Sequence, residues 1–255
     1  MKQLVARIHL WAGLVLGLQV VLWTASGVVM SWFHIDDVKG LPNVRAAAPA
    51  PIEAAGLIPL DAAIAAAAGA AGGAVEEIAL KTFLGAPVFL ARGPAGAVMI
   101  DAASGQVLSP LDEARALAAA RADFAGAAPD AQAEWLEAAP VDYRGALPVW
   151  RVAMGDEAGT RLYVDPATGA ILARRNDLWR FYDFFWMLHI MDYEGRTDFN
   201  NPLLKTAAAA GLVFALSGLV MVGMRLRTGR YGADARLAAR ALRGGRRGAG
   251  RRRGV

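Results

Sequence analysis

Cysteine is absent from the 255 residues, which excludes disulfides, zinc–thiolate sites, iron–sulfur clusters and thiol nucleophiles. Several catalytic patterns are missing as well: there is no glycine-rich phosphate loop, H-E-x-x-H, S-x-x-K or G-x-S-x-G, and no flavin or nicotinamide fingerprint. The carboxylates fall singly on turns and helix faces, so no hydrolase mechanism can be assembled. Three histidines remain as the side chains with the most distinctive chemistry.

Two long segments have no formal charge. One covers 28 residues between Arg7 and Asp36, and the other covers 19 residues between Lys205 and Arg225. At about 1.5 Å per helical residue, each is long enough to cross a hydrocarbon core of about 30 Å, the second only just. A cleaved signal peptide is the alternative for the first segment, but its apolar run is longer than an ordinary signal core. The sequence therefore predicts two membrane spans.

Charge predicts the orientation of these spans. The first residues carry +2, residues 36–205 carry −8, and the tail from Arg225 carries +10. By the positive-inside rule, both termini are expected in the cytoplasm of a bacterium and the large loop in the periplasm, which places the protein in the inner membrane. The arginine-rich tail is expected to be disordered and to contact anionic lipids. Since orientation already accounts for these arginines, no nucleic-acid partner is expected.

The loop between the spans contains an internal repeat. Residues 58–68, "IPLDAAIAAAA", match residues 109–119, "SPLDEARALAA", and residues 87–108 match residues 148–172. The offset grows from 51 to 64 between the two matches, mostly before Pro148. Each copy is predicted to be an alanine-rich helix followed by two or three short strands, which makes the loop an α+β domain.

Turn and capping residues mark the ends of these predicted elements. Asp and Gly in "DAASG" and "DPATG" predict hairpin connections at Asp101–Gly105 and Asp165–Gly169. Ser109, Pro110 and Asp112 fit an N-cap, a first-turn proline and a first-turn acid. Asn176 or Asp177 is expected to cap an aromatic interfacial helix, and Asn201 with Pro202 to open the second span.

These motifs together resemble one known family. A helix followed by strands ending in "VDPATGAIL" resembles the PepSY domain, and a duplicated copy between two spans resembles the PepSY-associated transmembrane proteins. The first span, "RIHLWAGLVLGLQVVLWTASGVVMSW", is similar to the family's His-x-Trp-x-Gly helix ending in Ser-Gly. The segment "LHIMDYEGRTDFNNPLL" resembles its histidine-containing approach to a second Ser-Gly helix. The resemblance covers residues 4–227.

All three histidines lie in or beside the spans. His9 and His34 end a stripe of small residues on one face of the first span, and His189 lies in the aromatic segment "FYDFFWMLHIMDY". Helix packing explains the small residues, which also occur in the second span at Ala207, Gly211, Ala215 and Gly218. Some members of the family are regarded as haem-containing reductases of iron–siderophore complexes. The resemblance thus implies haem b with His9 and His189, and less directly His34, as iron ligands.

Helix length restricts which histidines can share an iron. His9 and His189 are expected near opposite membrane boundaries, about 30 Å apart, so they cannot ligate one iron within a chain. His34 and His189 are expected on the same side and could do so. His9 would then need an exogenous ligand or a second copy, as in a homodimer through the small-residue faces. The alternative is that each histidine has no ligand role and lies at the membrane interface, where a polar ring is solvated. Separately, Gln19 is expected to make an interhelical hydrogen bond.

The sequence as a whole predicts an α+β membrane protein with two transmembrane helices flanking a duplicated PepSY-like helix-plus-antiparallel-sheet domain. The first span is expected in residues 1–35, a linker with the first repeat in 36–108, and the second repeat in 109–175. The interfacial helix with its turn is expected in 176–201, the second span in 202–224 and the tail in 225–255. The leading function is haem-dependent electron transfer or reduction at the periplasmic face, directed at ferric chelates in iron uptake, with a quinol or a partner protein as electron donor. Two alternatives are a non-enzymatic module that binds a ligand or restrains a peptidase, and an accessory subunit of a membrane complex.

Overall fold

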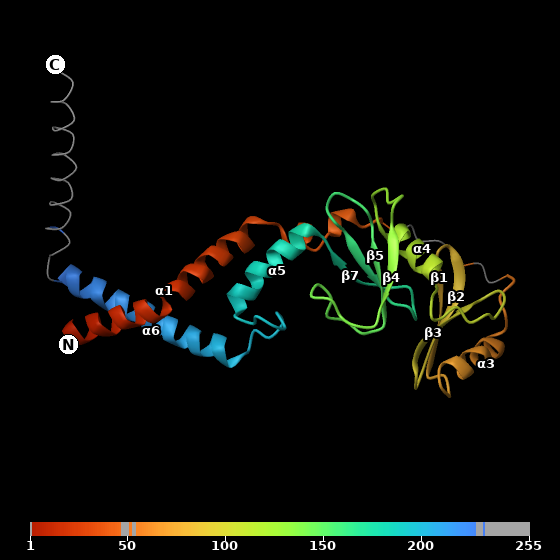
Figure 1. The fold of residues 1–255 in the computed structure, drawn as a ribbon. Coiled ribbons are helices and arrows are strands. Elements are labelled where there is room, and N and C mark those ends of the chain that lie inside the picture. The colour runs from red at the N-terminus through yellow and green to blue at the C-terminus, as the bar shows by residue number, and fades with distance from the viewer. Residues whose placement is uncertain (1, 47–50, 53–54, 228–231, 233–255) are drawn as a thin grey trace, which may run out of the picture. The chain divides into compact units, whose positions relative to one another are not determined.

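The structure is a computed structural model that describes residues 2–46, 51–52, 55–227 and 232. It divides into two compact units, each described here by itself: a membrane unit of Met1–Met30 with Phe185–Val255, and a loop domain of Ser31–Phe184. Figure 1 labels the helices and strands along the chain. Most of the predicted basic tail lies outside the described residues.

Two long helices form most of the membrane unit: α1, Lys2–Trp32, and α6, Pro202–Arg227. The predicted start of α6 is confirmed, because the Asn201 side chain accepts a hydrogen bond from the backbone N–H of Leu204 at 2.8 Å. Large apolar side chains on both helices are exposed, including Leu14, Val15 and Leu219. Exposed apolar area on this scale would be unfavourable in water, so these surfaces belong in lipid.

The aromatic segment forms helix α5, Asp177–Ile190. Of the two predicted capping residues, Asn176 is the one that acts: its side-chain oxygen accepts a hydrogen bond from the backbone N–H of Trp179 at 2.6 Å. A short helix α2, Ile35–Val38, and a 3-10 turn η1, Leu41–Asn43, follow the first span. The Asn176 amide also donates to the backbone carbonyl of Asp37 at 3.2 Å, which ties these two segments of the loop domain together.

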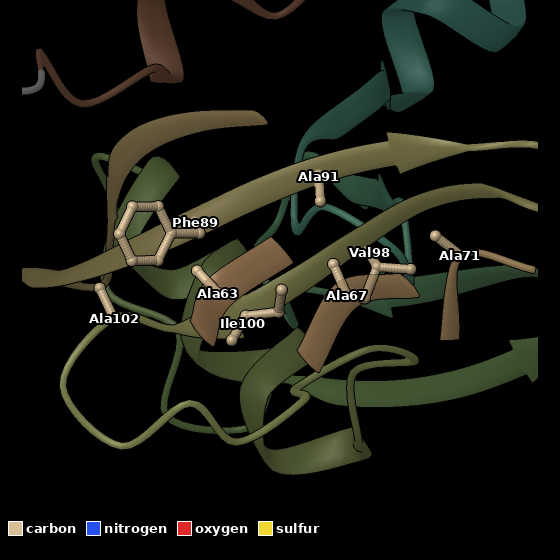
Figure 2. Close-up of a cluster of buried hydrophobic side chains, with 8 residues drawn as sticks. All are labelled: Ala63, Ala67, Ala71, Phe89, Ala91, Val98, Ile100 and Ala102. Carbon is tan, nitrogen blue, oxygen red and sulfur yellow. The ribbon is translucent and has the colours of Figure 1, made fainter. Parts of the chain in front are cut away.

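The first copy of the repeat is a helix packed on one face of a three-stranded sheet. Helix α3, Leu60–Ala70, precedes strands β1, Glu77–Phe83; β2, Ala86–Gly93; and β3, Gly96–Asp101. The strands are antiparallel in the order β1-β2-β3. Figure 2 shows the core between helix and sheet, where alanines of the helix meet Phe89, Val98 and Ile100. Alanine keeps the helix close to the sheet because it adds little bulk at the contact.

The second copy repeats this plan with one strand more. Helix α4, Glu113–Asp123, is followed by four antiparallel strands in chain order: β4, Gln132–Leu136; β5, Val149–Ala153; β6, Arg161–Val164; and β7, Ile171–Arg175. The expectation of two or three strands is therefore wrong here. In the first copy, the counterpart of β7 is only an isolated bridge between Ile100 and Val107.

The predicted hairpin turns are confirmed. The Asp101 carboxylate accepts hydrogen bonds from the backbone N–H groups of Ala103 and Ser104, and Gly105 has a φ of 76°. Asp165 accepts in the same way from Ala167, and Gly169 has a φ of 71°. Each aspartate therefore closes its turn, and each glycine takes the left-handed position that a side chain would strain.

The predicted start of the second helix is wrong in detail. Asp112 is the N-cap of α4, since its side chain accepts from the backbone N–H of Arg115 at 2.8 Å. Ser109 instead accepts a hydrogen bond from the Met99 N–H and donates one to the Ala167 carbonyl at 2.6 Å. The serine hydroxyl thus joins β3 of the first copy to the turn of the second, a tertiary role that competes with the local capping pattern.

The long connection between β4 and β5 covers the free face of the second sheet, on the side away from α4. Its Tyr143 ring stacks on Tyr163 with 4.4 Å between centroids. Its Asp142 carboxylate accepts hydrogen bonds from the Tyr163 hydroxyl at 2.7 Å and from the Arg161 guanidinium at 3.1 Å. The extra residues of the second copy therefore complete its core.

Charge makes this cover sensitive to acid. Burial alone would raise the pKa of Asp142, but the hydrogen bond from Tyr163 and the charge of Arg161 outweigh burial, so the pKa lies below its ordinary value of 3.8. Burial and the neighbouring carboxylate raise the pKa of Tyr163. Since the folded pKa of Asp142 is the lower one, its contribution to stability is present above about pH 4 and is lost as the pH falls through the folded pKa.

We predict that Asp142→Ala destabilises the second sheet by about 2 kcal/mol near pH 7, because it leaves two polar partners of a buried carboxylate unpaired. Hydrogen exchange of the full chain should then show faster exchange in β6. The matched control is Asp130→Ala, which removes an exposed aspartate from the same domain. Below pH 3 the gap between Asp142→Ala and the unaltered chain should shrink; a gap that stays constant from pH 7 to pH 3 would contradict the assignment.

Candidate cofactor site

In the membrane unit, α1 and α6 run in opposite directions and meet through small residues (Figure 1). A Cβ placed on Gly13 would lie 3.1 Å from the Phe214 ring, and one on Gly211 would lie 3.4 Å from Trp23. Part of the predicted small-residue stripe therefore packs one helix against the other. Gly17 and Gly27 do not take part, because within the described chain a Cβ on either would meet no atom within 4 Å.

His9 lies against α6. Its ring stacks on Phe214 with 4.4 Å between centroids and an interplanar angle of 9°. Its Nδ1 lies 2.9 Å from Ser217 Oγ and 3.3 Å from the backbone carbonyl oxygen of Phe214. A Cβ added to Gly218 would lie 3.2 Å from His9 Cε1, so the glycine leaves room for the imidazole. The ring is therefore fixed in both plane and position.

These contacts assign the proton of His9. A carbonyl oxygen can only accept, and the Ser217 hydroxyl already donates its single hydrogen to the Phe214 carbonyl at 2.7 Å. This arrangement favours a ring that carries its hydrogen on Nδ1 and donates it to these oxygens. In the neutral ring the lone pair is then on Nε2.

His189, near the end of α5, makes the equivalent contact with α1. Its Nδ1 lies 2.9 Å from Ser26 Oγ, and the Ser26 hydroxyl donates to the Leu22 carbonyl at 2.7 Å. Ser26 is fully buried, so its oxygen has no access to lipid or water. As at His9, a serine hydrogen directed to its own helix favours Nδ1–H and a lone pair on Nε2.

Two further hydrogen bonds hold the backbone of α5 beside α1. Trp23 Nε1 donates to the His189 carbonyl at 2.8 Å, and Gln19 Nε2 donates to the Leu188 carbonyl at 3.5 Å. The predicted interhelical hydrogen bond of Gln19 is therefore confirmed, although it is long. Both donors lie in the first span, where an unpaired polar group would be costly.

The two imidazoles lie at different heights along α1. His9 and Ser26, the partner of His189, are seventeen residues apart on this helix, which corresponds to about 26 Å. A single iron between them is therefore excluded within one chain, as the sequence predicted. Each imidazole occupies a separate position of the same kind, in which a serine of a facing helix fixes its tautomer.

His34 is in a different setting. It belongs to the loop domain, its side chain is 71% exposed, and it caps α2 by accepting a hydrogen bond from the Asp36 N–H at Nδ1, at 3.4 Å. Because Nδ1 accepts there, the neutral ring carries its hydrogen on Nε2, the opposite tautomer to His9 and His189. Its pairing with His189 at one iron remains a prediction.

The serine partners were missed as functional residues in the sequence. Ser26 and Ser217 stood out only as parts of Ser-Gly motifs at the ends of the two spans. A usable signal was present: each span holds one Ser-Gly pair, and all three histidines lie in or beside the spans. In the described ranges, including the surroundings of the histidines, no group of three or more histidines and carboxylates could hold a metal ion.

Comparison with known proteins agrees with this architecture. The sequence profile of the family described as PepSY-associated TM region matches residues 6–253. No curated protein and no solved structure matches the chain. Two helices, Gln3–Trp32 and Pro202–Arg227, are long and apolar enough to cross a membrane. The chain is therefore a membrane protein that belongs to the PepSY-associated TM region family.

Proposed function

We propose that this protein carries haem b in the membrane and transfers electrons to the periplasmic face, where ferric chelates are reduced during iron uptake. The observation that carries the proposal is the shared tautomer of His9 and His189. In both, Nδ1 lies 2.9 Å from a serine oxygen, an arrangement that favours Nδ1–H and a lone pair on Nε2. Histidines that ligate metals typically have this arrangement, with the second nitrogen bound to an oxygen of the protein.

The surroundings of the two histidines fit a haem ligand. Both rings are half-buried, and each is held by a hydrogen bond to a neighbouring helix, so Nε2 has a defined position. Gly17 and Gly27 of α1 leave open space that a larger side chain would fill. Bound haem iron would supply one-electron transfer, and the protein would supply ligand, orientation and an apolar environment.

The two positions also fit transfer across a membrane. Their separation of about 26 Å along α1 is close to the thickness of the hydrocarbon core, so one histidine lies towards each surface. Each requires a second ligand or an open coordination position. We propose that a homodimer through the small-residue faces, an exogenous ligand, or His34 for the His189 position supplies it. The electron donor is then a quinol or a partner protein.

The charge distribution supports an orientation for this pathway. On the basis of the basic ends and the acidic loop, we propose a bacterial inner-membrane protein with both termini in the cytoplasm and the duplicated domain in the periplasm. His9, near the N-terminus, is then at the cytoplasmic side, and His189 is at the periplasmic side. The basic tail is proposed to contact anionic lipids of the cytoplasmic leaflet.

We predict a b-type Soret band that shifts on reduction in the full chain purified from haem-replete cells. His9→Ala and His189→Ala should each remove or alter about half of this absorbance, because each ring serves a separate position. A fully folded, colourless preparation would contradict the proposal. His34→Ala separates the ligand arrangements: an unchanged spectrum assigns the second ligand elsewhere, and an altered one assigns it to His34.

We predict that Ser26→Ala and Ser217→Ala each weaken haem binding roughly tenfold, because loss of the acceptor frees the Nδ1–H and the ring orientation. Ser26→Thr and Ser217→Thr keep the hydroxyl and are the matched controls. The measurement is the haem content of each variant after dilution against a haem-binding competitor. Equal retention in the alanine and threonine variants would show that the serines only pack the helices.

A further inference from the structure

The two copies of the repeat differ in what covers the face of the sheet that is not packed against the helix. In the second copy, the connection between β4 and β5 runs over residues 137–148 and covers this face. In the first copy, β1 and β2 are joined by residues 84–85 alone. Among the described residues, the β1–β2 connection provides no such cover; Leu111, after β3, buries Met99, while Leu90 stays partly exposed.

A groove occupies the uncovered face of the first sheet. Its volume is about 370 Å³, close to the lower end for small-molecule sites. Its open apolar lining includes Ala79, Leu90 and Ala97, whereas Val88 and Met99 are buried in a cluster with Leu111. Thr168, in the turn of the second copy, and Ala170 line it as well. Helix α3 packs on the opposite face, so it does not fill the groove (Figure 2).

The second copy indicates what chemistry this face accepts. There the covering groups are an aromatic ring, Tyr143, stacked on Tyr163, and a carboxylate, Asp142, bound to Arg161. Tyr163 holds the position on β6 that Met99 holds on β3, at the repeat offset of 64. In the first copy Leu111 already packs on Met99, so the part of the face that stays open lies at Leu90. A flat apolar body on Leu90 would extend this cover, and an anionic group would repeat the carboxylate.

Cationic side chains lie at the rim of the groove. Lys81 lines it, and within the described part of the chain no carboxylate lies within ion-pair distance of its ammonium group. Arg92 also lines it and is only loosely paired, with Nε 3.9 Å from a carboxylate oxygen of Glu77. The local balance is +1, although residues 36–205 carry −8 in total. An anion is therefore favoured at this place on an otherwise acidic domain.

We propose that the groove binds a small organic anion with a flat apolar body, such as an aromatic carboxylate. The apolar body lies on Leu90 and Ala79, and the anionic group pairs with Lys81 and Arg92. This site lies in the loop domain and involves none of the histidines, so it does not depend on the haem proposal.

The test uses the full chain in phosphatidylcholine nanodiscs, with para-trifluoromethylbenzoate as the probe and fluorine NMR as the measurement. Para-trifluoromethylbenzamide, which has the same shape without the charge, is the second probe. Lys81→Gln should weaken benzoate binding about fivefold, in keeping with a partly exposed ion pair, and should leave benzamide binding unchanged. Ala79→Phe fills the groove from β1 and should weaken binding of both probes at least tenfold.

Matched controls lie outside the groove. Lys39→Gln removes an exposed lysine of the same domain, and Leu80→Phe adds the same ring on the opposite face of β1; neither should change the affinity. Absence of benzoate binding at millimolar concentration, or equal affinity for both probes, would overturn the proposal. Binding of a synthetic peptide of residues 137–147 in place of the benzoate would also overturn it, since the occupant would then be a peptide segment.

Discussion

A polar group inside a membrane needs a partner, and two serine–histidine hydrogen bonds meet this need in the membrane unit. Ser217 accepts from His9, and Ser26 accepts from His189. Each serine returns its own hydrogen to its helix, so each imidazole is left with one defined tautomer. The packing of α1 against α6 and of α5 against α1 depends on these bonds, since they are among the few polar contacts between apolar helices.

The loop domain consists of two copies of one helix-and-sheet unit that differ in how the second face of the sheet is covered. Both copies pack an alanine-bearing helix on one face of an antiparallel sheet. The second copy covers its other face with its own chain and fixes that cover with a buried carboxylate. The first copy leaves part of this face open, next to the position where Leu111 covers Met99. A repeated fold thus gives one closed core and one open surface from nearly the same pattern of residues.

Much of this architecture could be predicted, because it depends on local pattern and charge. The length of the uncharged segments predicts the two spans, and the spacing of Asp and Gly predicts the turns at Asp101 and Asp165. The predictions fail where tertiary contacts decide. Ser109 looks like a helix cap, but its hydroxyl joins the two copies.

The histidines of the candidate site were predicted from the sequence, but their hydrogen-bond partners were not. His9 and His189 followed from motifs, whereas their hydrogen-bond partners come from other helices, more than 160 residues away along the chain. Spacing along one helix carries no information about such contacts. The same limit explains why His34 was grouped with the other two: its exposed, capping environment differs from theirs only in three dimensions.

The tautomers of the three histidines test the account most directly. With only three such residues in the chain, nitrogen-15 histidine labelling gives a spectrum that single alanine variants can assign. In the haem-free protein in lipid, above the pH at which imidazole is charged, His9 and His189 should be protonated at Nδ1. Protonation of either ring at Nε2 would contradict the account, because the serine would then be a donor and the lone pair would not be available to a metal.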